Sequence, residues 1–166
     1  MDVIYLPPVL GVLGLIVAFI IYKLVTRYPA GEGLVAQIAE EIHTGAMVFL
    51  KREYSILAMF CAVVIILLFI GFKSWHTPLA FVIGALCSAS AGFAGMFAAT
   101  KANVRTTVAA NTEGPATALS VAFYGGAVMG LTVASMGLLG LGILYLLFGS
   151  DHHSCSAPPR IFRYFS

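Results

Sequence analysis

The sequence predicts an all-α protein, a polytopic bundle of four transmembrane helices. Hydrophobic residues make up 60% of the 166 residues and charged residues only 10%, far from the roughly one quarter that is charged in soluble proteins. Four long apolar runs can each cross a hydrocarbon core of ~30 Å at ~1.5 Å per residue. Small residues recur at helical spacing in the later runs. The expected spans are about 3–25, 46–72, 77–101 and 116–148.

The first span is expected to be a retained transmembrane helix and not a cleaved signal peptide. Residues 3–22 carry no charge, Asp2 precedes them, and Lys23 and Arg27 follow. A signal peptide would have a basic start, a shorter apolar core and a small-residue cleavage site. Pro7 and Pro8 fall in the first turn, where proline costs little because the amides there have no partner inside the helix.

The second span is expected to be the far half of one long helix. Residues 28–33, YPAGEG, predict a turn, and helical periodicity resumes after it. An apolar face is formed by Leu34, Ile38 and Ile42, opposite a polar face with Gln37, Glu40 and Glu41. We expect the helix to project from the bilayer, with Lys51, Arg52 and Glu53 at the water boundary.

His43 lies on this projecting part of the helix. We expect it to face solvent or a neighbouring helix. A catalytic or metal-binding role is disfavoured, because a lone histidine has no second ligand beside it in the sequence.

The third span is the stretch around which the others are expected to be arranged. Trp75 suits the membrane interface, and Pro78 suits a first helical turn. Two small-residue stripes follow at four-residue spacing, Gly84/Ser88/Gly92 and Ala91/Gly95/Ala99, and the stretch ends in Lys101, Asn103 and Arg105. Such stripes let a second backbone approach closely. This pattern predicts a buried helix with a cationic end.

The fourth span begins after Gly114 and Pro115 and carries another stripe, Ala122/Gly126/Gly130/Ala134. Glycine weakens a helix in water by roughly 1 kcal/mol relative to alanine, but an unpaired backbone group in a bilayer costs more. We therefore interpret the stripe as a packing device and not as a ligand site. The third and fourth helices are expected to pack through this stripe and Gly84/Ser88/Gly92.

Lysine and arginine predict the orientation. They cluster in the first connection and around Lys101 and Arg105, whereas only Lys73 lies in the second connection. The positive-inside rule then places the N-terminus and the tail outside, or in a lumen, and the first and third connections in the cytosol. The protein is expected in a bacterial inner membrane or a vacuolar-type membrane.

No catalytic, cofactor-binding or metal-binding residue is predicted from the chemistry of the side chains. Cys61 and Cys87 lie in apolar runs and are expected to pack as small hydrophobes. His152, His153 and Cys155 could bind a metal, but a short tail makes this a weak candidate. The net charge of +2 and the pattern of residues predict no nucleic-acid surface.

Three blocks in order carry a family resemblance: EIHTGAMVFLKREYSILAMF, CSASAGFAGMFAATKANVRTTVAA and ALSVAFYGGAVMGLTVASMGLLGL. They resemble the N-terminal region of membrane-bound, ion-translocating inorganic pyrophosphatases. The matching positions are Gly45, Ala46, Phe49, Leu50, Glu53, Tyr54, Gly95, Met96, Ala99, Thr100, Ala102, Asn103, Arg105, Thr106, Ala122, Phe123, Gly126, Ala127, Val128, Met129 and Gly130. The resemblance covers nearly all of residues 3–149.

The resemblance implies a homodimeric enzyme that hydrolyses magnesium pyrophosphate in the cytosol and pumps protons or sodium ions outward. It implies sixteen helices, of which the first four support an inner ring that holds the site. The family's aspartate- and lysine-rich motifs do not occur in this sequence, so no catalytic residue carries over, and no Mg²⁺ is expected to bind here. Residues 150–166 are expected to diverge from the family, as a truncated or frameshifted reading frame would.

Two functions from different classes remain open. In the first, the chain is the N-terminal part of a pyrophosphate-driven ion pump and is inactive by itself. In the second, it is a free-standing four-helix membrane protein that associates with partners through its small-residue stripes.

Overall fold

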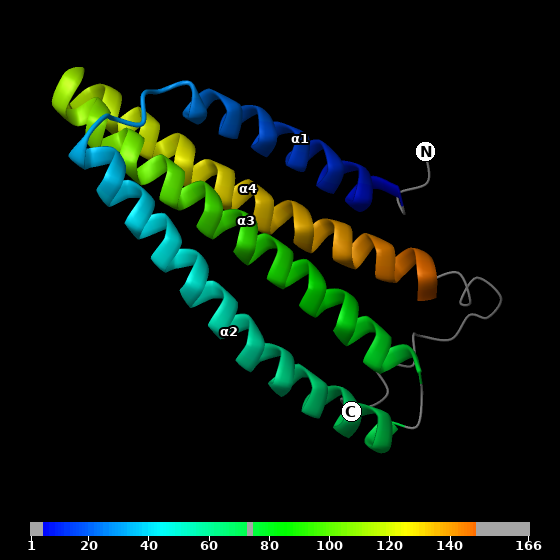
Figure 1. The fold of residues 1–166 in the computed structure, drawn as a ribbon. Helices are drawn as coiled ribbons and strands as arrows, with labels where there is room; N and C mark the ends of the chain where they lie inside the picture. The colour runs from blue at the N-terminus through cyan, green and yellow to red at the C-terminus, as the bar shows by residue number, and fades with distance from the viewer. Residues whose placement is uncertain (1–4, 73–74, 149–166) are drawn as a thin grey trace.

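The computed structural model is a bundle of four long helices and describes residues 5–72 and 75–148 (Figure 1). The helices are α1 Leu6–Thr26, α2 Leu34–Phe72, α3 His76–Thr112 and α4 Pro115–Phe148. All four are long and apolar enough to cross a membrane, and the described residues contain no strand. The predicted all-α class with four helices able to span a membrane is therefore confirmed, whereas the bounds of the membrane spans remain a prediction.

The first helix begins and ends where local chemistry predicts. Pro7 and Pro8 lie in the first turn of α1, which begins at Leu6 after Tyr5 at the N-cap. The chain then reverses through the predicted turn, where Gly31 has φ 80° and Gly33 has φ 61°. Glycine adopts this left-handed backbone without a steric penalty, so the turn returns the chain alongside the bundle.

The second helix is continuous, as predicted, and it packs on α3 alone among the described helices. Its contact with α3 includes Leu50, which is buried, and Tyr54, whose hydroxyl donates a 2.6 Å hydrogen bond to the Ala89 carbonyl. The apolar face of Leu34, Ile38 and Ile42 is exposed. Helical periodicity was therefore the correct prediction, but this apolar face is not the one that packs within the chain.

The third helix lies at the centre of the bundle and contacts each of the other three helices. Its buried positions are mostly small, including Ala91, Gly95, Ala98, Ala102 and Ala109. Small side chains allow backbones to approach closely, so the prediction that this segment organises the chain holds.

The fourth helix begins after Gly114, which has φ 94°, and packs between α3 and α1. A Cβ added to Gly11 would lie 2.7 Å from Leu139 Cγ, and one added to Gly142 would lie 2.7 Å from Pro8 Cδ. Together with Gly14, which faces Ser135, these glycines are therefore points where α1 and α4 approach closely.

The predicted pairing of stripes between α3 and α4 is wrong. Gly84 and Ser88 are exposed, Gly92 faces the Tyr54 hydroxyl of α2, and the whole stripe Ala122/Gly126/Gly130/Ala134 is exposed. The helices meet instead where Gly95 faces Met129 and Gly125 faces Ala102. Four-residue spacing identifies a face that a second helix can approach closely but not the helix that approaches it, and α3 carries two such faces.

Candidate functional site

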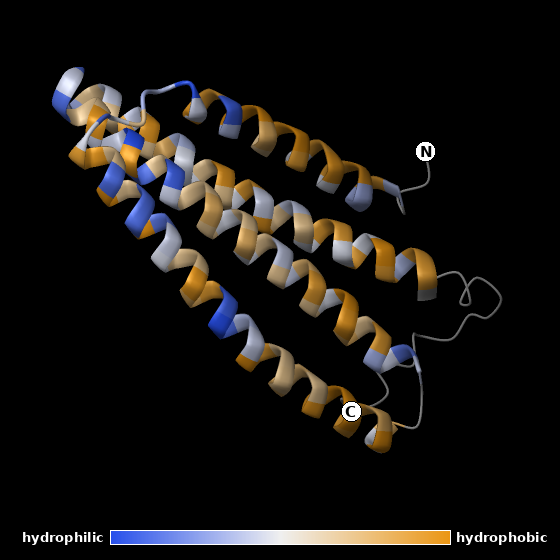
Figure 2. Cartoon of the chain, in the orientation of Figure 1, coloured by the Kyte–Doolittle hydropathy of each residue, from blue (hydrophilic) through white to orange (hydrophobic). Residues whose placement is uncertain are grey.

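Polar residues gather at the end of the bundle where α1 and α3 end and α2 and α4 begin (Figures 1 and 2). Figure 2 also shows a separate hydrophilic turn partway along α2, where Lys51 and Arg52 are exposed. Beneath the polar end lies a buried cluster of Val25, Ala102, Ala109, Ala118 and Val121, with Tyr28 packed against it. The polar end is therefore held together by its own small core.

Arg105 ties the turn after α1 to α3. Its Nε donates to the Tyr28 carbonyl at 3.1 Å, and its Nη1 donates to the Lys101 carbonyl at 2.7 Å. The side chain is half-buried. The sequence predicted only a cationic end to the segment, and the structure assigns this arginine a role in positioning the α1–α2 turn.

His43 faces α3, one of the two placements the sequence left open. Its Nδ1 lies 2.8 Å from Thr100 Oγ1, and its ring meets Phe97 edge-on at 5.2 Å. The Thr100 hydroxyl also lies within hydrogen-bond distance of the Phe97 carbonyl, at 3.0 Å, and with its one hydrogen donated there it accepts from Nδ1. This arrangement makes His43 a contact between helices.

The carboxylates of the described residues do not converge on a site. Across residues 5–72 and 75–148, no group of three or more histidines, cysteines, aspartates or glutamates is placed to hold a metal ion. Asp2, Asp151 and the candidate ligands His152, His153 and Cys155 lie outside the described residues. The absence of catalytic, cofactor-binding and metal-binding residues remains a prediction.

A groove of about 440 Å³ runs between α3 and α4 near the polar end. It is lined by Ala99, Ala102, Asn103, Thr106, Thr107, Ala122, Gly125, Gly126 and Met129. The two threonine hydroxyls donate to carbonyls of their own helix, and the exposed Asn103 side chain forms no hydrogen bond with any described residue. The groove therefore offers a free amide beside an exposed glycine.

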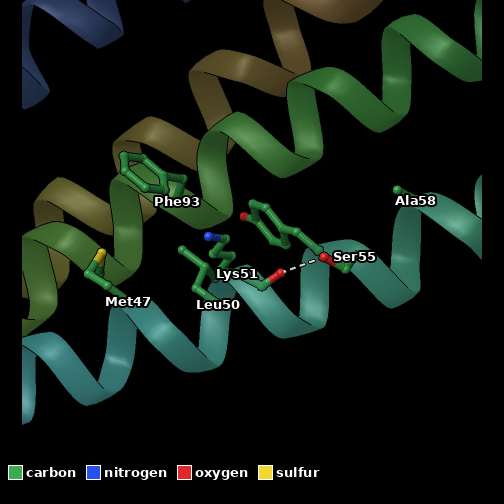
Figure 3. Close-up of a pocket in the computed structure, with 7 residues that line it drawn as sticks. Met47, Leu50, Lys51, Ser55, Ala58 and Phe93 are labelled. Carbon is green, nitrogen blue, oxygen red and sulfur yellow. Dashed lines mark hydrogen bonds between the residues drawn. The ribbon is translucent and has the colours of Figure 1, made fainter.

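A second groove of about 480 Å³ lies between α2 and α3 and is shown in Figure 3. Its lining is Met47, Leu50, Lys51, Tyr54, Ser55, Ala58 and Phe93. Lys51 rises from α2 toward α3, and its carbonyl accepts a 3.0 Å hydrogen bond from Ser55 Oγ. The groove is thus mostly apolar with one cation. The sequence did not predict it, because its walls come from segments far apart in the chain.

Four membrane-compatible helices joined by short connections define a polytopic helical membrane protein. Comparison with known families identifies it further: a sequence model of the inorganic H⁺ pyrophosphatase family matches residues 12–166. The chain belongs to this family. The matched range includes residues 150–166, which the sequence analysis expected to diverge and which lie outside the described residues.

Individual relatives agree with the family match. The K⁺-stimulated pyrophosphate-energized sodium pump of Thermotoga maritima is 46% identical over 131 residues, covering 77% of this chain and 18% of the relative. A K⁺-insensitive pyrophosphate-energized proton pump of Moorella thermoacetica is 40% identical, covering 91% and 22%. The corresponding proton pump of Methanosarcina mazei is 37% identical, covering 88% and 22%. The chain therefore spans about a fifth of the length of these relatives.

Proposed function

We propose that this chain supplies the first four helices of a pump that couples pyrophosphate hydrolysis to outward transport of protons or sodium ions. The family match over residues 12–166, together with the coverage of only about a fifth of each relative, carries this proposal. Similar identities to sodium and proton pumps leave both ions open. The membrane would be a bacterial inner membrane or a vacuolar-type membrane.

The chemistry would reside in the rest of the pump. Hydrolysis of pyrophosphate needs carboxylates to hold Mg²⁺, cations to offset developing charge and a positioned water. The described carboxylates of this chain do not converge on one point, so Mg²⁺ would be held by helices beyond these four. The assembled pump would form homodimers, as the family resemblance implies.

The exposed face of α4 is the proposed contact for those remaining helices. In the apolar half of α2, after Glu53, the exposed side chains are mostly large and apolar, including Phe60, Ile66 and Leu67, as suits contact with lipid. Along α4 the exposed stripe Ala122/Gly126/Gly130/Ala134 is small, as suits close approach of another helix. The groove beside it adds the free amide of Asn103.

Co-expression tests the proposed function. The chain alone should release no phosphate from Mg²⁺ and pyrophosphate after reconstitution. Co-expressed with the Thermotoga maritima pump lacking its first four helices, it should restore hydrolysis. Gly126→Leu should abolish this rescue, whereas Gly71→Leu, on the exposed face of α2, should preserve it. Mg²⁺-dependent hydrolysis by the chain alone, or no rescue despite stable co-assembly, would contradict the proposal.

The N-terminus is proposed to lie outside and the α3–α4 turn in the cytosol, on the basis of the lysine and arginine distribution. In a variant whose native cysteines are replaced by serine, Glu113→Cys should react with an impermeant maleimide only after the membrane is opened. Glu113 is exposed at the end of α3, so its accessibility reports the side of the membrane. Labelling of Glu113→Cys in intact cells would show that the α3–α4 turn lies outside and would contradict the proposed orientation.

A further inference from the structure

We propose that the groove between α2 and α3 binds an anionic phospholipid, with the lipid phosphate at Lys51 Nζ and an acyl chain along Ser55 and Ala58. This assigns a lipid-binding site to the chain, beyond its proposed part in the pump. Three features of the groove favour such a lipid: its shape, its depth in the membrane and its charge.

The shape follows from the way α2 packs. Because α2 contacts α3 alone among the described helices, its sides are open to the surroundings. The walls of the groove are bulky, since Met47 and Leu50 rise from α2 and Phe93 lies on α3 (Figure 3), and Tyr54 of α2 also lines it. A helix backbone needs small residues to approach closely. A flexible acyl chain can follow an uneven apolar channel, so these walls favour a lipid over another helix.

The depth of the groove matches the headgroup boundary. Before Lys51, the exposed residues of α2 mix carboxylates with apolar side chains, Glu40 and Glu41 with Ile42 and Val48. After it they include Ile56, Met59 and Phe60, with exposed fractions of 52%, 67% and 63%. The groove crosses this transition, from Met47 through Lys51 to Ala58.

Neighbouring helices place the boundary at a similar level. The Tyr22 ring of α1 lies 6.4 Å from the Phe97 ring of α3, and Lys23 directly follows the uncharged run of α1. Phe93, which lines the groove, lies one turn from Phe97 on the same helix. Because His43 meets the same Phe97 ring, Lys51 and Lys23 lie within about two helical turns of each other in depth, near the level where a phospholipid carries its phosphate.

The charge is available to bind an anion. The Lys51 side chain is exposed at the mouth of the groove, and its ammonium forms no ion pair with any described residue. Basic side chains at the membrane surface attract anionic lipids, each contributing about 1 kcal/mol. A zwitterionic lipid has no net charge to supply this attraction, so the site should select anionic headgroups.

Native mass spectrometry of the full chain tests the site. The chain in detergent is mixed with equal amounts of phosphatidylglycerol and phosphatidylcholine of matched acyl chains, and the detergent is then removed in the gas phase. Phosphatidylglycerol should be retained preferentially, and Lys51→Gln should reduce that retention about fivefold, the equivalent of about 1 kcal/mol. Arg52→Gln is the matched control, because Arg52 is also exposed and adjacent but does not line the groove.

A second variant tests the apolar part without changing charge. Ala58→Phe should fill the channel and lower phosphatidylglycerol retention while circular dichroism and melting temperature stay unchanged. If Lys51→Gln and Arg52→Gln lower phosphatidylglycerol retention equally, the lipid is held by general attraction to positive charge and the proposed site is wrong. Equal retention of both lipids, or a dimer of the chain that Ala58→Phe abolishes, would also overturn it. Failure of the pump rescue described above would not affect these readouts.

Discussion

Gly125→Leu should separate α3 from α4 and destabilise the bundle by about 1–3 kcal/mol or more, as overpacking of a tight interface does. A Cβ on Gly125 would lie only 2.5 Å from the Ala102 Cβ, and both residues are buried. The Ala102 side chain is a single methyl group fixed to the α3 backbone, and no change of rotamer can move it away. The two helices themselves must therefore move apart. Titration with a denaturing detergent, followed by circular dichroism, measures the loss.

The neighbouring glycine provides the control. Gly126→Leu introduces the same side chain one position along α4, where a Cβ would have no atom of another element within 4 Å among the described residues. The isolated chain should tolerate it within about 0.5 kcal/mol, as surface positions usually do. Equal sensitivity at Gly125 and Gly126, or greater sensitivity at Gly126, would refute the observed packing of α3 on α4.

The helices were predictable because their signals are local. Uncharged runs, the prolines at 7 and 8 and the glycines at 31, 33 and 114 each act on their own segment. A run of about 20 apolar residues must satisfy its backbone internally when it lies in lipid. The continuity of α2 followed from the same reasoning, since no proline or glycine pair interrupts residues 34–70.

The interfaces were not predictable, because they depend on which faces meet. Both stripes of α3 have the spacing that allows close packing, yet Gly95 faces α4 while Gly92 faces the Tyr54 hydroxyl of α2. On the α4 stripe, a Cβ added at Gly126 or Gly130 would meet no atom of another described element within 4 Å. Small residues indicate where another element can approach a helix closely, but the packing of the whole bundle determines which element lies there.

The contacts of polar side chains could not be predicted from the sequence either. Arg105 and Tyr28 are separated by 77 positions and yet form a 3.1 Å hydrogen bond. His43 and Thr100 are separated by 57 positions and lie 2.8 Å apart. Each contact needs the register between two helices, which hydrophobic periodicity does not provide. The sequence could therefore identify these polar residues but not the partner that each of them contacts.

Arg105→Met should release the turn between α1 and α2 and lower stability by about 1.5 kcal/mol, the low end for hydrogen bonds to a charged group. The guanidinium donates to the carbonyls of Tyr28 and Lys101, and methionine keeps an unbranched apolar stem of similar length without a donor. The low end is expected because the side chain is half-buried, and water can therefore replace part of the lost bonding.

The sharper readout of this change is local. Amide hydrogen exchange should rise through residues 27–33, because the Arg105 bond to Tyr28 holds that turn against α3, while exchange in the apolar half of α2 should not change. Arg52→Met is the matched control, since Arg52 is exposed and makes no hydrogen bond or ion pair through its side chain within the described part of the chain. Arg105→Lys should fall between the two, because one ammonium lacks the fork that reaches both carbonyls. If exchange in the turn rises equally in Arg105→Met and Arg52→Met, loss of positive charge is the cause and the hydrogen bonds of Arg105 do not position the turn.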